Sequence, residues 1–301
     1  MKKKTPNCVK DAAIGAAIGT AIIIPGISGG TIALISGAYQ RIIRAAKSLF
    51  SKLFFKNILI LLPFLIGAVI SVGALVVPFQ LAFKYCLFSI VCLFAGFILG
   101  SIPGIHDEIK DEKTETKNTI QLVIGAIFAI SIGVLSVVLK ADSVIKNLFE
   151  EVPFYLYFII FAVGMIGAVG LVVPGFSGSM LMILIGFYEP ILGLVNFDNF
   201  LRNVSLLFVF GIGLLIGVVL LSKIMDPLLT NHKKSTMHVV IGFVVGSLVS
   251  IFLNSGMVDY IKSDAFGLLD WILGPCLFVV GLILSILFTR FKRKYMDEKN
   301  A

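Results

Sequence analysis

Long apolar stretches dominate the chain, and short polar segments separate them. Seven of these stretches are each about long enough to cross ~30 Å of hydrocarbon as an α-helix. They cover residues 57–82, 85–105, 119–139, 154–173, 203–222, 237–253 and 268–289. A membrane β-barrel would instead show alternating segments of about ten residues. The pattern therefore predicts an all-α polytopic membrane protein.

Two apolar segments are interrupted in the same way, by PGISGG at residues 25–30 and by PGFSGS at 174–179. Aligning residues 13–43 with 162–192 gives nine identities in 31 columns, most of them Gly, Pro, Ser or Tyr. Shared hydrophobicity does not explain identities of these types. A second echo pairs GFILGS with GFVVGS further along each half. We therefore predict two repeats, residues 1–141 and 142–301.

Each repeat is expected to hold one re-entrant helical hairpin, at residues 12–43 and 154–193, followed by three transmembrane helices. With both termini cytoplasmic, this topology leaves 5 of the 25 Lys and Arg residues outside and 20 inside. If the broken segments crossed fully, the same count would be 15 inside and 10 outside. The positive-inside rule favours the hairpins, although 154–173 is long enough to cross alone. Three crossings per repeat make the two repeats inverted, as in many secondary transporters.

Composition and charge narrow the class of protein further. The chain is 58% hydrophobic and 14% charged, whereas soluble domains carry about a quarter charged residues. The net charge of +8 sits beside the apolar stretches, as orientation signals do, so we predict no nucleic-acid partner. The four cysteines show neither metal-ligand nor C-x-x-C spacing. We predict no metal, no cofactor and no catalytic residues.

The interrupted segments carry the chemistry that suggests a binding site. Pro25 and Pro174 end the incoming helix, and a new helix is expected to begin near Ser28 and Ser177. Open backbone at membrane depth is tolerated only where it is buried in protein or lines a cavity. The start of a helix favours anions, and hydroxyl groups add donors for a phosphate or carboxylate. These hydroxyls belong to Ser28, Thr31, Ser177 and Ser179.

Helix packing is the alternative explanation for the glycines. Three Gly-x-x-x-Gly patterns, beginning at Gly15, Gly96 and Gly242, are predicted to be packing faces. Packing alone does not require a hydroxyl at the same place in both interrupted segments. For those segments we therefore favour an anion site.

Several residues near the ends of the hairpins have two interpretations. Arg41 either recruits an anionic headgroup or anchors its helix at the interface. Glu189 either carries a proton or serves as an ordinary interfacial residue. Tyr39 and Tyr188 occupy equivalent places in the two repeats and suit either an aromatic belt or a ligand contact.

The segments PGISGGTIALISGAYQRII and PGFSGSMLMILIGFYEPIL resemble those of a bacterial family of polyprenyl-phosphate transporters, the PopT-like undecaprenyl-phosphate translocases. The resemblance extends over essentially the whole chain. It implies a plasma-membrane protein that returns undecaprenyl phosphate, the lipid carrier of cell-wall synthesis, from the outer to the cytoplasmic leaflet. The phosphate-binding residues that it implies are Gly26, Ser28, Gly29, Gly30, Thr31, Gly175, Ser177, Gly178 and Ser179.

The resemblance also bears on energy coupling, and two other functions compete with lipid-phosphate transport. Family members often carry acidic residues where this chain has Thr20, Ala21 and Gln40, which leaves Glu189 as the coupling candidate. The expected energy source is a proton or sodium gradient.

One competing hypothesis is a transporter or channel for a small anion. The other is a membrane enzyme acting on lipid phosphates, which is disfavoured because no His, Asp and Arg set lies at a common depth.

Overall fold

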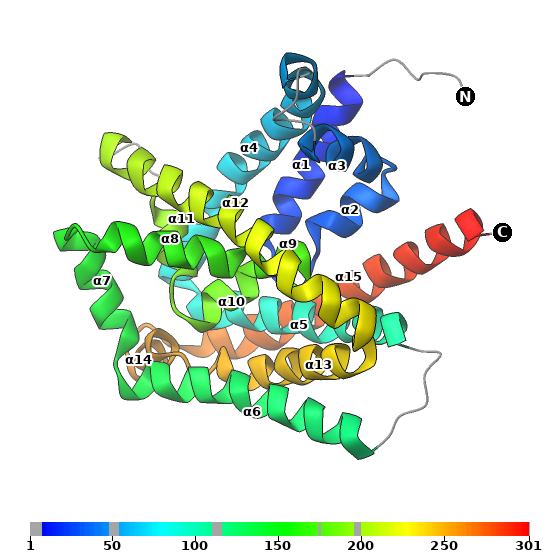
Figure 1. Cartoon of the computed structure of the whole chain (residues 1–301). Helices are drawn as coiled ribbons and strands as arrows, with labels where there is room; N and C mark the ends of the chain where they lie inside the picture. Colours follow the sequence, from blue (N-terminus) through cyan, green and yellow to red (C-terminus); the bar gives the residue numbers. More distant parts are fainter. Residues whose placement is uncertain (1–7, 48–53, 110–115, 174–175, 196–199, 301) are drawn as a thin grey trace.

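The computed structural model describes residues 8–47, 54–109, 116–173, 176–195 and 200–300. Every regular element within these residues is helical, as the apolar pattern predicts (Figure 1). Six of the helices are long and apolar enough to span a membrane. They are α4 (Phe54–Tyr85), α5 (Leu87–His106), α6 (Thr116–Val138), α12 (Phe200–Asn231), α13 (Lys233–Ser250) and α15 (Leu268–Asn300).

These six helices coincide with six of the seven predicted stretches. The remaining stretch, 154–173, is divided into α8 (Leu156–Gly167) and α9 (Val169–Val172) and is shorter than the others. Large apolar side chains such as Leu65, Phe128 and Leu215 are exposed on the long helices. In water such a surface would be unfavourable, and in a bilayer it contacts lipid. The chain is a multi-pass membrane protein.

Shorter helices precede α4 and α12 in a matching order. The first group contains a long arm, a break, a short helix and a further short helix, and the second group repeats this order. The groups are α1 (Cys8–Ile23), α2 (Gly29–Ile35) and α3 (Tyr39–Lys47), and α8, α9, α10 (Gly178–Leu184) and α11 (Tyr188–Gly193). The remaining helices are η1 (Asp107–Ile109), α7 (Ala141–Glu151) and α14 (Ser255–Lys262).

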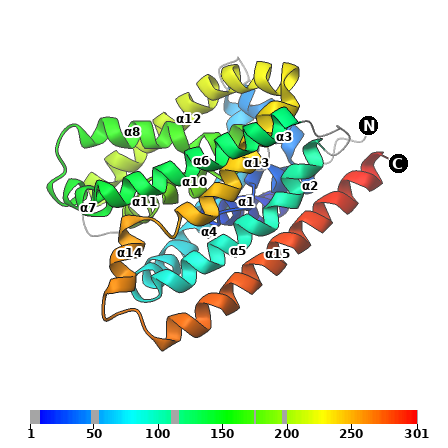
Figure 2. The same cartoon turned by 90° about the horizontal axis from the view of Figure 1, so that it is seen from below.

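The main helix contacts also fall into matching pairs. Helix α1 packs on α4, and α8 packs on α12. The two most buried long helices, α5 and α13, pack against each other and each has a long partner, α15 for α5 and α6 for α13. Figures 1 and 2 show α15 running along α5 and α6 running along α13. The short helix α2 contacts α15, and α10 contacts α6.

Glycines let these paired helices approach closely. A Cβ added to the first glycine of each predicted Gly-x-x-x-Gly pattern would overlap a backbone carbonyl of the facing helix. The prediction that these patterns are packing faces is therefore confirmed. The overlapped carbonyls belong to Phe64 for Gly15, to Phe278 for Gly96 and to Leu122 for Gly242.

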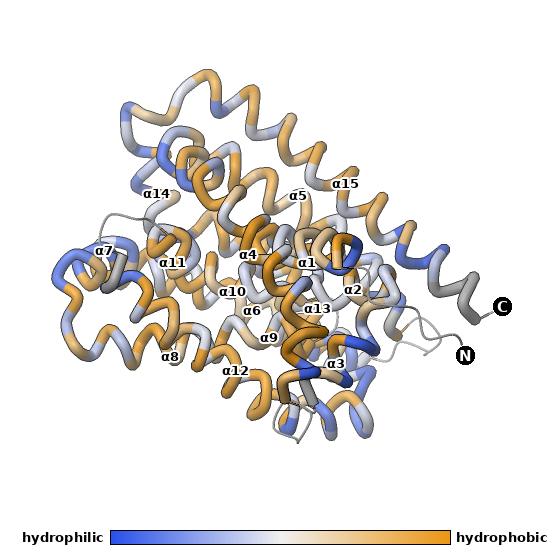
Figure 3. Tube along the Cα trace, turned by 90° about the horizontal axis from the view of Figure 1, so that it is seen from above, coloured by the Kyte–Doolittle hydropathy of each residue, from blue (hydrophilic) through white to orange (hydrophobic). Residues whose placement is uncertain are grey.

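Polar residues gather at two opposite ends of the bundle. Figure 3 shows hydrophilic residues around α7 and α14 at one end and along the last turns of α15 at the other. Hydrophobic residues fill the helices between them. Such a distribution matches an apolar slab bounded by two aqueous faces.

Candidate functional site

The first break lies between α1 and α2 and is built around Gly26. Helix α1 ends at Ile23, two residues before Pro25. Gly26 has φ +83°, and a Cβ there would lie 2.7 Å from the Phe97 carbonyl. Only glycine adopts this backbone so close to α5 without strain. The break is thus fixed by the contact between this turn and a central helix.

Ser28 starts the helix that follows. Its carbonyl accepts a hydrogen bond from the Ile32 amide at 3.2 Å, and its Oγ accepts a longer one from the Thr31 amide at 3.4 Å. These are the contacts of an N-cap residue, which satisfies amides that the helix leaves free. The prediction that a new helix begins near Ser28 is confirmed.

The second break, between α9 and α10, has a similar serine. Helix α10 begins at Gly178, directly after Ser177, whose backbone is extended. The Ser177 Oγ and Ser179 Oγ lie 2.7 Å apart and share a hydrogen bond, and both residues are buried. The prediction that a helix begins near Ser177 is also confirmed. The predicted residues Pro174 and Gly175 lie outside the described residues.

Both breaks open into one cavity of about 270 Å³. Ser28 and Gly29 line it from the first break, and Ser177, Gly178 and Ser179 line it from the second. The remaining lining is mostly apolar and comes from α1, α4, α8 to α12 and the turns beside them, and none of the described lining residues is charged. The structure thus brings together hydroxyl groups from segments 149 positions apart. The predicted residues Gly26, Gly30 and Thr31 do not line the cavity.

Tyr188 connects the second broken segment to the first. Its hydroxyl donates a 2.7 Å hydrogen bond to the Ile23 carbonyl at the end of α1. The ring packs against Phe83 and Phe94, with centroids 5.6 and 5.9 Å away, and Tyr188 is 4% exposed. Tyr188 is therefore an internal contact and not part of an aromatic belt in this structure.

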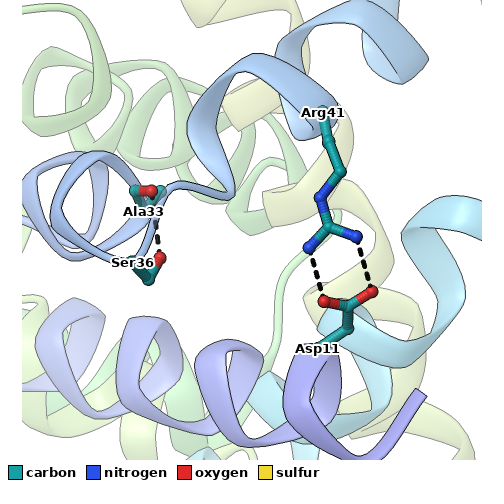
Figure 4. A network of polar contacts seen from close by, with 4 residues as sticks. All are labelled: Asp11, Ala33, Ser36 and Arg41. Carbon is teal, nitrogen blue, oxygen red and sulfur yellow. Dashed lines mark hydrogen bonds and ion pairs between the residues drawn. The ribbon is translucent and has the colours of Figure 1, made fainter. Parts of the chain in front are cut away.

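Arg41 lies away from the cavity and is bound to Asp11. Its Nη1 donates to Asp11 Oδ2 at 2.9 Å, and its Nη2 donates to Asp11 Oδ1 at 2.5 Å (Figure 4). The guanidinium also lies 5.3 Å from the centroid of the Phe64 ring. Asp11 is 2% exposed, so this bidentate pair neutralises a buried carboxylate and ties α3 to α1. Figure 4 also shows the hydroxyl of Ser36, which bonds the Ala33 carbonyl within the same arm.

Glu189 lies on a second, polar cavity of about 380 Å³. Asp142, Lys146 and Arg202 line this cavity with it, and the Lys146 Nζ lies 3.1 Å from Asp142 Oδ2. Burial lowers the pKa of Lys146, but the hydrogen bond to Asp142 and the nearby carboxylates raise it by more. The Lys146 ammonium is therefore retained at neutral pH. Helix α11 separates this cavity from the central one, since its residues line both.

Comparisons with known proteins identify the family to which this site belongs. A family model described as "Undecaprenyl phosphate translocase-like" matches residues 18–266, which include both breaks. The chain belongs to this family. A "Polyprenyl-phosphate transporter" of Staphylococcus aureus (strain NCTC 8325 / PS 47) is 30% identical over 283 residues, 92% of this chain and 94% of the relative. A protein of the same name from Vibrio cholerae serotype O1 (strain ATCC 39315 / El Tor Inaba N16961) is 30% identical over 265 residues, 84% and 80% of the two chains.

Membership of this translocase-like family settles the broad class of the protein. Its relatives are named as transporters and not as enzymes, in agreement with the sequence prediction. No solved structure gives a significant match to the chain.

Two buried carboxylates of this translocase-like protein were not anticipated from sequence. Asp11 partners Arg41, as described above. Asp270 of α15 accepts hydrogen bonds from Ser89 of α5 at 3.1 Å and from Tyr260 of α14 at 3.0 Å. The available signal was an acidic residue at the beginning of an apolar helix, since a buried charge requires partners. Asp270 thus joins α15, α5 and α14 at the end of the bundle where α7 lies.

Proposed function

We propose that this protein moves undecaprenyl phosphate from the outer to the cytoplasmic leaflet of the bacterial plasma membrane. The observation that carries the proposal is the central cavity, which serine residues from both breaks line. The names of the relatives supply the substrate class. In this proposal the phosphate binds between Ser28 on one side and Ser177 and Ser179 on the other.

The chemistry of the cavity suits a lipid phosphate. A phosphate monoester offers several acceptor oxygens, and the three serine hydroxyls can donate to them. The apolar remainder of the lining suits the first isoprene units of the carrier, because contacts with apolar side chains replace their contacts with lipid. A small hydrated anion would gain little from such walls, because desolvation costs it more than an apolar surface returns. The lining therefore favours the lipid phosphate over a small inorganic anion.

Inverted repeats would allow the central cavity to open to one side of the membrane and then to the other. We propose that residues 1–141 and 142–301 are these repeats, with hairpins at 12–43 and 154–193 entering from opposite sides. The distribution of Lys and Arg supports this topology with both termini cytoplasmic. The matching pairs α1 with α4 and α8 with α12 support it as well. Alternating access by one repeat moving against the other is the usual consequence of this design.

Energy coupling is assigned to an ion gradient, of protons or sodium ions. Glu189 is the proposed coupling carboxylate, because it faces a polar cavity one helix away from the central cavity. Arg41 remains the proposed headgroup contact at the opposite arm, in exchange with Asp11. Substituting Glu189 by Gln should lower gradient-driven translocation and leave exchange at equilibrium intact.

A leaflet-translocation assay with short-chain polyprenyl phosphate in proteoliposomes tests the proposal. Ser28→Ala and Ser177→Ala should each reduce the rate about tenfold or more, since a hydrogen bond to a charged group contributes roughly 1.5–3 kcal/mol. Ser131→Ala is the matched control, because Ser131 is on α6 and bonds only its own helix. Unchanged rates in both site variants would contradict the assignment. Release of inorganic phosphate by the wild type would contradict transport as the function.

A further inference from the structure

The two arms that follow the breaks begin alike. Helix α3 starts at Tyr39 and α11 at Tyr188, and these tyrosines are 149 positions apart, like the breaks. Each tyrosine comes two residues after a glycine with positive φ, +71° at Gly37 and +79° at Gly186. The same backbone turn thus leads into both arms.

Beyond the turn, the arms lie differently. Helix α11 packs across on α4 of the other half, whereas α3 packs on α2 and α4 of its own half. Tyr188 is 4% exposed and bonds the end of α1, whereas Tyr39 is 38% exposed and its hydroxyl bonds no described residue. Helix α11 lines the central cavity, and α3 does not. Only the second arm crosses to the other half, and α3 is held to its own half through Arg41 and Asp11.

The repeat defines where the other arm would dock. The counterpart of Ile23, the last residue of α1, is Val172, the last residue of α9. A tyrosine hydroxyl at the end of a helix satisfies a carbonyl that the helix itself leaves unpaired. The contact equivalent to Tyr188 with Ile23 is therefore Tyr39 with Val172.

We propose that Tyr39 and Tyr188 are alternating positioning residues of the transport cycle. In the structure described, Tyr188 holds α11 against the end of α1, so that α11 separates the central cavity from the polar cavity at Glu189. In the opposite state Tyr39 docks at Val172, α3 closes the cavity from its own side, and α11 withdraws. The proposal rests on the inverted repeats of the proposed function, since their exchange of conformations supplies the second state.

Cross-linking of cysteine pairs in a background without the four native cysteines tests the exchange. Ile23→Cys with Tyr188→Cys reports the observed state, and Val172→Cys with Tyr39→Cys reports the opposite one. Both pairs should cross-link in membranes. Adding Tyr188→Phe to the second pair should raise its cross-linking about fivefold, the population shift expected from one lost hydrogen bond. Tyr85→Phe, an exposed tyrosine on α4, should leave the yield unchanged.

A second measurement uses a reference protein in which Tyr39 and Tyr188 are both unchanged. Leu192 is buried in α11, and a Leu192→Cys reporter should react about fivefold faster with a thiol reagent when Tyr188 is changed to Phe. No cross-link between positions 39 and 172, or an unchanged labelling rate at position 192, would overturn the proposal. If both results appear but wild-type protein moves no polyprenyl phosphate, the proposed function fails and the exchange of arms stands.

Discussion

The two broken segments agree at their tips and differ in their arms. In each tip a serine precedes a short helix, and both serines line the same central cavity. In the arms, α3 is held by an ion pair between Arg41 and the buried Asp11, whereas α11 is held by hydrogen bonds that involve uncharged side chains. Four of the nine identical positions lie within the tips, at 25, 26, 28 and 29, which suits the shared phosphate site that we propose. In the transport cycle that we propose, the arms differ because each controls a different side of the protein.

The largest effect is expected at a tip, from Gly26→Ala. A Cβ at this position would be held at a positive φ and would overlap the Phe97 backbone. We therefore expect the free energy of unfolding to fall by about 2 kcal/mol or more and translocation to be lost. Thermal unfolding in detergent and the translocation assay measure both. Gly73→Ala is the control, because a Cβ there meets nothing within 4 Å. Equal stability of the two variants would show that the tip tolerates ordinary backbone.

A smaller effect is expected in the first arm, from Asp11→Asn. This change removes the charge that Arg41 binds. The free energy of unfolding should fall by about 1–3 kcal/mol, since Asp11 is buried but Arg41 is partly exposed. Asp107→Asn breaks a comparable pair with Arg293 at the surface and should cost under about 1 kcal/mol. Chemical denaturation of both variants in the same detergent makes the comparison. Similar losses would mean that burial of Asp11 does not strengthen its pair.

The smallest effect is expected in the second arm, from Gln80→Leu. The Gln80 side chain donates a 2.8 Å hydrogen bond to the Leu192 carbonyl, which fastens α11 to α4. Removing this hydrogen bond should lower the free energy of unfolding by about 0.5–1.5 kcal/mol and speed amide hydrogen exchange in α11 about fivefold. Gln40→Leu in the exposed first arm is the matched control. Unaltered exchange in α11 would remove Gln80 from the account of this arm.

Local features of the fold were predictable from sequence. The six long helices, the restart of the helix after each serine and the glycine packing faces all depend on residues close together in the chain. The anion-site list was broader than the cavity lining, because successive residues on a helix point about 100° apart. Ser28 and Gly29 therefore face the cavity, while Gly30 and Thr31 do not.

Long-range pairings were not predictable from one sequence. The partners of Arg41, Tyr188 and Ser89 lie 30, 165 and 181 positions away. Hydropathy and spacing show that a buried polar group needs a partner, but not which helix supplies it. The asymmetry of the arms depends on such long-range pairings, so it was not predictable either.

The central claim, that both tips form one phosphate site, is tested most directly by ligand protection. Ser28→Cys and Ser177→Cys, each in a cysteine-free background, are treated with a small thiol reagent while short-chain polyprenyl phosphate is titrated. The account predicts that both cysteines are protected with the same midpoint concentration, and that the uncharged polyprenol protects neither. Protection of only one cysteine, or midpoints that differ between the two, would contradict a single shared site.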